Sequence, residues 1–184
     1  MRTSLIVVIG LLFFINCGKK SDQKTGGADQ GAQTESYIAH LPQNLQKLIG
    51  VEFGPDSMPT GYKEETGYVM GYLEGDEYII DHVSGENLQM LWFCKLTSRD
   101  TEGRPFLKIL DILILPTIEK NEELLMGTCK YNEEMDPEIV AIVKFNESEV
   151  KSDVIKAWRA NRNSRKFEVI PVTNITCFNE SFYL

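Results

Sequence analysis

The stretch LQMLWFCKL, residues 88–96, decides the fold because its apolar side chains alternate along the chain. Alternate residues of a strand point to the same side of a sheet. Five side chains are therefore expected to share one face: Leu88, Met90, Trp92, Cys94 and Leu96. The next run, FLKILDILIL at 106–115, is apolar on both faces except at Lys108 and Asp111, as in a strand covered on both sides. These two stretches predict the centre of a sheet.

Segments on either side extend this sheet. ELLMGTCKY at 123–131 and EIVAIVKF at 138–145 predict two more strands, and the short polar linkers between all four favour antiparallel neighbours. We therefore expect a four-stranded meander. Upstream, GYVMGYLEGDEYIIDH predicts a hairpin that turns at Glu74-Gly75-Asp76, and KFEVIPV at 166–172 predicts a last strand.

Two short helices are expected beside the strands. One covers residues 42–49, with Pro42 in its first turn. The other covers residues 150–160, with Val150, Val154, Ile155 and Trp158 on one side. The predicted fold class is α+β: one domain at 36–184, mainly an antiparallel sheet, with one or two short helices on one face.

The N-terminus has the features of an export signal. Arg2 precedes an apolar run of about eleven residues at 5–15, which is roughly 16 Å long as a helix. A bilayer core needs roughly 20 residues, so the run is too short to span and matches the apolar part of a secretory signal. Cys17 follows at once, ahead of the lysines in GKKSD.

These residues resemble a bacterial lipoprotein signal. The resemblance implies that the signal at 1–16 is removed and that Cys17 becomes the first residue, acylated on its sulfur. Asn16 departs from the small residue that the family prefers before the cysteine. Gly18 is not the Asp that retains such proteins at the inner membrane, so an outer-membrane location is implied where that membrane exists.

Residues 17–35 are expected to form the lipidated cysteine and a flexible tether. The stretch GKKSDQKTGGADQGAQTE has no aromatic or branched apolar residue, so it cannot bury enough surface to offset the entropy of ordering. The acyl chains would be the contact with the membrane, and the domain would stand off its surface.

The C-terminal stretch KAWRANRNSRKFEVIPVTNITCFNE resembles a recurring ending of small uncharacterised bacterial envelope proteins, many of them lipoproteins. The shared pattern is K-A-W-R-x-N, then K-F-E-x-I, then I-x-C-x-N-E. It covers Lys156 to Asn161, Lys166 to Ile170 and Ile175 to Glu180. Arg165 stands where Gly is usual. The resemblance implies no activity.

The charge limits the classes of partner. Against 19 Lys and Arg there are 27 Asp and Glu, a net charge of −8. An acidic domain repels phosphate backbones, so we expect no nucleic-acid partner.

The cysteines beyond the signal are expected to be unpaired. In the meander, Cys94 and Cys129 would lie two strand spacings apart, too far for a disulfide. We therefore expect Cys94, Cys129 and Cys177 to be buried thiols. None has the C-x-x-C spacing of a zinc site, so no metal or other cofactor is expected.

Few titratable residues suggest chemistry. Asp81 and His82 stand near Asp76 and Glu77, but adjacent strand residues point to opposite faces, so we expect solvated strand ends rather than a metal or general-base site. Asp111 either has a raised pKa and a function, or sits at a strand bend with its hydrogen bonds met. We expect the second.

Two sets of residues are candidates for binding. The first is four tyrosines, whose rings suit a sugar or a protein: Tyr62, Tyr68, Tyr72 and Tyr78. The second is a basic island near the C-terminus, which could meet an anionic lipid headgroup, a glycan or a protein: Lys156, Arg159, Arg162, Arg165 and Lys166. A tyrosine-lined sheet edge and a solvated turn are the simpler interpretations of the two sets.

The sequence thus favours a lipid-anchored envelope protein that binds or scaffolds a partner without catalysis. Two alternatives stay open: an envelope hydrolase that uses carboxylates not located by the sequence, and an inhibitor or immunity-type lipoprotein.

Overall fold

The computed structural model describes residues 41–73, 75–179 and 182. The expected signal, Cys17, the tether and the boundary at Ser36 lie outside these residues. None of the helices in the described part is long and apolar enough to cross a membrane.

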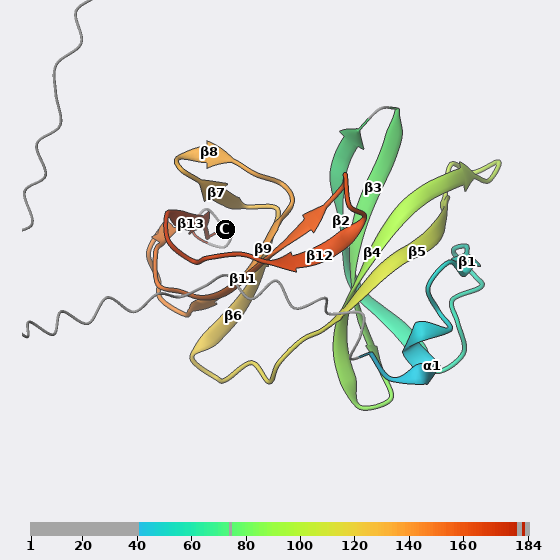
Figure 1. Cartoon of the computed structure of the whole chain (residues 1–184), viewed down its shortest axis with the longest axis horizontal. Coiled ribbons are helices and arrows are strands. Elements are labelled where there is room, and N and C mark those ends of the chain that lie inside the picture. Colours follow the sequence, from blue (N-terminus) through green and yellow to red (C-terminus); the bar gives the residue numbers. More distant parts are fainter. Residues whose placement is uncertain (1–40, 74, 180–181, 183–184) are drawn as a thin grey trace, which may run out of the picture. The chain divides into compact units, whose positions relative to one another are not determined.

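Three antiparallel sheets form the described part of the chain (Figure 1). Sheet A has the order β1-β5-β4-β3-β2, with β1 at Glu52–Phe53, β2 at Tyr62–Leu73, β3 at Asp76–Gly85, β4 at Leu88–Arg99 and β5 at Pro105–Ile114. Sheet B has the order β12-β11-β9-β6, with β6 at Glu122–Met126, β9 at Ile139–Lys144, β11 at Val154–Asn161 and β12 at Lys166–Val169. Sheet C has the order β10-β13-β7-β8, with β7 at Cys129–Tyr131, β8 at Glu134–Met135, β10 at Val150–Lys151 and β13 at Ile175–Phe178.

Three apolar cores hold the sheets together. The central core lies between sheets A and B and includes Phe93 of β4 and Trp158 of β11. The second core covers the other face of sheet A, where Leu45 of the short helix α1 (Gln43–Gln46) packs over Trp92. The third lies between sheets B and C and includes Ala157. Sheets A and B are thus each covered on both faces.

The alternation in β4 is confirmed. Met90, Trp92 and Cys94 all belong to the core beneath α1, whereas Leu91 and Phe93 belong to the central core. The hairpin of β2 and β3 is also confirmed, with Leu73 opposite Asp76. The stretch 166–172 contains β12, but β13 follows it, so it is not the last strand.

The predicted four-stranded meander does not continue beyond β5. The outer edge of β5 is occupied by β1, which pairs Phe53 with Leu107. The chain therefore leaves for sheet B, where β6 pairs with β9. The run 123–131 is two strands, because Gly127 adopts a φ of 72° and turns the chain into sheet C. A Cβ at Gly127 would lie 2.0 Å from the ring of Tyr68, so glycine is required there.

The prediction of a second helix at 150–160 is also wrong, and the fold is mainly β rather than α+β. Residues 150–160 form β10 and most of β11. Positions 150, 154 and 158 are four residues apart. This spacing places side chains on one face of a helix and, because four is an even number, also on one face of a strand. The spacing therefore does not discriminate a helix from a strand. In the second half of β11 both faces are buried, with Trp158 in the central core and Ala157 in the third, as in a strand between two layers.

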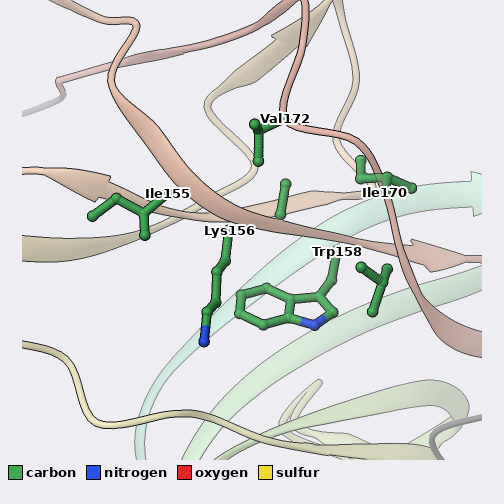
Figure 2. Close-up of a pocket in the computed structure, with 7 residues that line it drawn as sticks. Ile155, Lys156, Trp158, Ile170 and Val172 are labelled. Carbon is green, nitrogen blue, oxygen red and sulfur yellow. The ribbon is translucent and has the colours of Figure 1, made fainter. Parts of the chain in front are cut away.

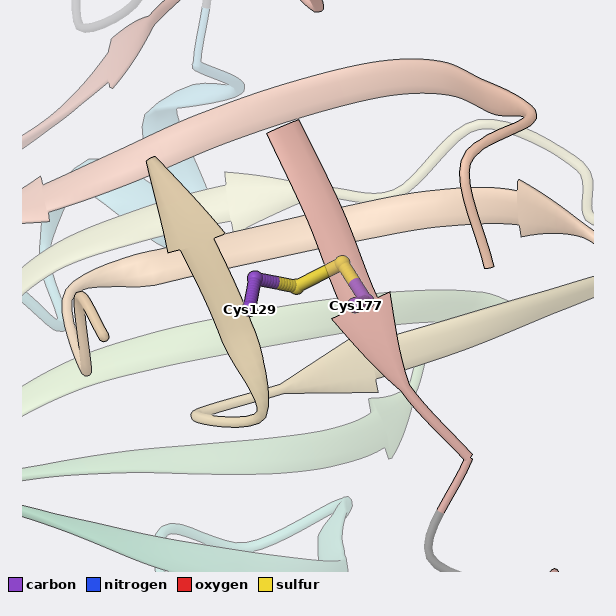
Figure 3. The surroundings of a disulfide bond; sticks show 2 residues. All are labelled: Cys129 and Cys177. Atoms are coloured by element: carbon purple, nitrogen blue, oxygen red, sulfur yellow. A yellow bond between two sulfur atoms is a disulfide. The ribbon is translucent and has the colours of Figure 1, made fainter. Parts of the chain in front are cut away.

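The expectation of three unpaired thiols is wrong. Cys129 of β7 and Cys177 of β13 lie opposite each other in sheet C and form a disulfide, with their Cα atoms 3.9 Å apart (Figure 3). The expectation depended on Cys129 being a sheet A residue, whereas β7 belongs to sheet C. Cys94 is the free cysteine of the described residues and is buried.

Candidate functional site

The tyrosine set does not form one surface. Tyr62 packs on Trp92 with ring centroids 5.4 Å apart, and its hydroxyl donates to Glu86. Tyr68 packs against the central core, on the other face of sheet A. Tyr78 is 2 % exposed and belongs to the central core. Tyr72 lies opposite Glu77, in β2.

The basic residues are spread along a hairpin, because their segment is a strand and a turn rather than a helix. Arg159 pairs with Asp136, and Arg162 pairs with Glu138 at 2.7 Å. Lys156, Arg165 and Lys166 are exposed, but Lys156 lies near the start of β11, whereas Arg165 lies in the turn after β11 and Lys166 is the first residue of β12. The set is therefore no continuous cationic patch.

Asp111 sits at a bend, as expected, but its hydrogen bonds are only partly met, because its buried Oδ1 has no partner among the described residues. A bulge in β5 places it opposite Phe93, and its Oδ2 accepts a hydrogen bond from the Phe167 backbone N–H at 2.7 Å. Burial raises the pKa of this carboxyl, while the hydrogen bond from Phe167 opposes the rise. Asp111 therefore joins β5 to β12 across the central core.

The acidic residues near His82 are not a cluster of solvated strand ends. Asp76 pairs with Lys95 at 2.6 Å, and Glu77, only 6 % exposed, pairs with Arg99 at 2.9 Å. Asp81 is 2 % exposed and faces away from His82. In the part of the chain that the structure describes, no three His, Cys, Asp or Glu residues are grouped to hold a metal ion.

Another buried charge is structural. Lys151 is fully buried in β10, where its Nζ donates to the backbone oxygen of Asn146 at 2.6 Å and pairs with Glu123 of β6. This ion pair joins sheet C to sheet B.

A cavity of about 340 Å³ lies over sheet A, beneath the segment that leads from β1 to β2. Its lining is mostly apolar, with one carboxylate and one guanidinium: Phe53, Gly54, Pro55, Met58, Glu64, Arg104, Pro105 and Leu107. Arg104 is held at the rim by Asp100 at 2.7 Å and by Asp56 at 3.2 Å. Its positive charge is therefore already balanced. We call this space the Phe53 cavity.

Two carboxylates meet beside the Phe53 cavity. Asp81 lies opposite Gly67 in the β2–β3 pair. A Cβ on Gly67 would stand 2.8 Å from Oδ1 of Asp81 and 3.0 Å from Oε1 of Glu64, so the absence of a side chain at Gly67 makes room for both groups. Because both oxygens lie near this one point, they are at most 5.8 Å apart, which is 2.8 Å plus 3.0 Å.

The two carboxylates have different surroundings. Glu64 is exposed and lines the cavity. Burial and the charge of Glu64 raise the pKa of Asp81 to about 7, against a hydrogen bond from the Cys94 thiol that lowers it. Burial raises the pKa of Cys94 itself well above its usual value, with Asp81 adding to the rise. At neutral pH the Asp81 carboxyl is therefore close to half-protonated.

A second, apolar notch lies at the edge of sheet B, where the chain leaves β12 and uncovers part of β11 (Figure 2). It measures about 320 Å³. Its lining is apolar apart from one exposed lysine: Ile155, Lys156, Ala157, Trp158, Val169, Ile170 and Val172. The notch has no buried polar group that would orient a ligand, so the Phe53 cavity is the better-defined candidate site.

Sequence reasoning missed the Glu64–Asp81 pair. Counted back from the turn at Glu74-Gly75, a regular hairpin would place His82 opposite Gly67. The irregularity in β2 at 69–71 shifts the register by one residue and brings Asp81 there instead. Gly67 was the available signal, since a glycine inside a strand often marks a close approach.

The chain matches no protein-family model, no curated protein and no solved structure.

Proposed function

We propose that the protein is an exported, lipid-anchored binding module of the cell envelope, and that its ligand site is the Phe53 cavity. The observation that carries the proposal is the cavity itself, about 340 Å³ with an apolar lining and Glu64 at its side. Ligand sites for small molecules are concave, mostly apolar and of about 300–1,000 Å³, with a few polar groups that orient the ligand. The acidic charge of the chain supports a partner other than nucleic acid.

The ligand site is tested with 1-hexanol as a neutral apolar probe. We expect it to shift the amide NMR resonances of Gly54, Met58 and Glu64 in the full chain. Met58→Trp should remove these shifts, because the indole fills the cavity. Val169→Trp, at a position 52 % exposed in the apolar notch, is the matched control and should keep them. Shifts at the notch alone, or none, would refute this site.

The lipid anchor is tested by Cys17→Ser, because serine lacks the thiol that accepts the lipid. The wild type should partition into the detergent phase and carry the mass of acyl chains, and the variant should do neither. Cys94→Ala, which removes a cysteine outside the signal, should keep the lipid mass. A wild-type protein without added lipid mass would exclude the anchor.

Hydrolysis is the second candidate, and the Glu64–Asp81 pair is the observation that favours it. A carboxyl whose pKa is raised by burial, as that of Asp81 is, can act as a general acid beside a second carboxylate. Asp81, however, is not part of the cavity lining, so a substrate in the Phe53 cavity would meet Glu64 alone. The geometry therefore supports binding better than catalysis.

A further inference from the structure

We propose that an extended peptide segment of a partner protein binds as an added strand along the open edge of β6. The site is a groove of about 370 Å³ between β6 and β2, which we call the β2–β6 groove. It is separate from the Phe53 cavity and goes beyond the function proposed for that cavity. The proposal depends on the unpaired backbone of β6, on a buried hydroxyl, and on the shape and charge of the groove.

The β2–β6 groove lies where the edges of two sheets come together. β6 is the last strand of sheet B and β2 is the last strand of sheet A, so each is paired on one side only among the described residues. Four consecutive residues of β6, at 123–126, and three of β2, at 66–68, line the groove. Consecutive side chains of a strand point to opposite faces. A space that touches every residue of such a run therefore lies at the edge of the strand, where the backbone is accessible.

The backbone of β6 directs hydrogen-bonding groups into the groove. The backbone oxygen of Asn121 and the N–H of Gly127 both bond to the segment 139–145, at 2.8 Å and 3.3 Å. Backbone groups alternate in direction along a strand, and the pairing of β6 with β9 has no irregularity. The N–H and C=O groups of Leu124 and Met126 therefore point away from β9, toward the groove.

These groups have no partner in the part of the chain that the structure describes. Neither Leu124 nor Met126 forms a backbone hydrogen bond on the groove side, although both are half-buried. Oγ1 of Thr128, which also lines the groove, is buried and lacks a hydrogen-bond partner as well. Buried polar groups in proteins are nearly always paired, and an open strand edge is a template for a further strand. An extended peptide would satisfy all of these groups by adding to the sheet.

The shape and charge of the groove select the occupant. One extended segment can lie beside β6, but the edge of a whole second sheet would meet β2, so a peptide segment fits better than a second copy of the domain. Glu123 is the one charged residue of the lining, and it pairs with the buried Lys151. The chain as a whole has a net charge of −8. Because an acidic segment would be repelled, we expect a basic one.

The experiment uses a probe peptide that alternates threonine and valine between terminal lysines. It is titrated into the full-length Cys17→Ser chain, and amide hydrogen exchange is followed by NMR. At saturation the exchange of the Leu124 and Met126 amides should slow by about tenfold or more. The same peptide N-methylated at its three central residues keeps the side chains but loses the donors, so it should not bind. The peptide with terminal glutamates should bind more weakly.

Variants locate the site. Leu124→Pro removes an N–H that lies outside the β6–β9 ladder, which an edge strand tolerates. It should abolish peptide binding, whereas Leu124→Ala, which loses the same side chain but keeps the N–H, should retain it. The matched control is Val169→Pro in β12, the other edge of sheet B. Ile170 bonds to Ala157 there, so the N–H of Val169 points outward in the same way. This variant should bind the peptide as the wild type does.

Several results would overturn the proposal. Slow exchange of both amides in the free chain would mean that another segment of the chain or a second copy already covers the edge. Equal binding of the N-methylated and unmodified peptides would mean that no strand is added, and this comparison holds even if Leu124→Pro does not fold. Loss of binding in Val169→Pro alone would place the peptide at β12. Tighter binding of the glutamate peptide, or binding of neither peptide, would contradict a basic partner. The hexanol shifts at the Phe53 cavity are independent of all these outcomes.

Discussion

Sheet A and the pair of sheets B and C are built from the same kinds of strand but connected differently. In sheet A, strands β2 to β5 are neighbours in chain order, and each turn returns the chain to the strand just made. Between sheets B and C the chain alternates: β6 is in B, β7 and β8 are in C, β9 is in B, β10 is in C, β11 and β12 are in B, and β13 is in C. The alternation of apolar and polar side chains locates strands in both regions. It indicates which sheet a strand joins only where short turns connect neighbouring strands.

The two regions also differ in how they are closed. Sheet A is covered on one face by α1 and the segment around Phe53, and on the other by sheet B. Sheet C is small, and the disulfide of Cys129 and Cys177 joins two of its short strands. A sheet of short strands buries little apolar surface, so a covalent link contributes more to it than it would to sheet A.

The largest expected effect tests whether the two regions unfold together. Phe93 is fully buried and packs on Tyr78 of its own sheet and on Phe167 of sheet B, with centroids 5.7 Å and 5.8 Å apart. Phe93→Ala should lower the free energy of unfolding by about 3–5 kcal/mol. Denaturant unfolding of the variant should show one transition, because both regions share this core. Val69→Ala, at a position 53 % exposed in β2, should change little. Two separate transitions in the wild type would mean that the regions are independent.

The next effect concerns sheet C alone. The disulfide closes a loop with a sequence separation of 48. The chain-entropy relation for a loop of this length gives a loss of about 4 kcal/mol when Cys129 and Cys177 are both replaced by alanine. Denaturant unfolding with and without a reducing agent measures it: the wild type should respond to reduction and the double variant should not. Thiol titration of the denatured, unreduced Cys17→Ser chain should count one thiol, that of Cys94. A count of three would contradict the pairing.

The smallest effect is a pH dependence that belongs to sheet A. The pKa of Asp81 is about 7 in the folded protein against 3.8 as its ordinary value. Between these values the folded protein holds a proton that the unfolded chain has lost, so this group makes the wild type less stable as pH rises toward 7. Asp81→Asn removes the contribution. The variant should therefore gain roughly 2–3 kcal/mol relative to the wild type between pH 5 and pH 7.5.

Thermal or denaturant unfolding at several pH values measures this difference. Subtraction of the wild-type curve from that of Asp81→Asn cancels the other carboxyls, among them Asp111, whose pKa is also raised by burial. If the difference in the free energy of unfolding between the two proteins does not change with pH, Asp81 is ionised in the folded protein throughout this range. Contacts other than those described would then compensate for its burial.

Several parts of the fold could be predicted from particular residues. The alternation at 88–96 located β4 and the face of each of its side chains, and Asp111 was expected at a bend. The segment 150–160 was misassigned because residues four apart share a face in a helix and also in a strand, and its burial on both sides depends on sheets that are distant in sequence. The position of Asp81 could not be predicted, because an irregularity in β2 at 69–71 decides that Asp81, and not His82, lies opposite Gly67.

The sequence by itself determined where most strands of sheet A run, which faces of β4 are apolar, and that the hairpin turns near Gly75. These features follow from local alternation and local turns, so they need no knowledge of distant residues. Only the tertiary structure decided which sheet each later strand joins, that Cys129 meets Cys177, and that Asp81 meets Glu64. Each of these depends on register or on contacts across tens of residues, and a local pattern of apolar side chains is the same whichever partner the strand takes.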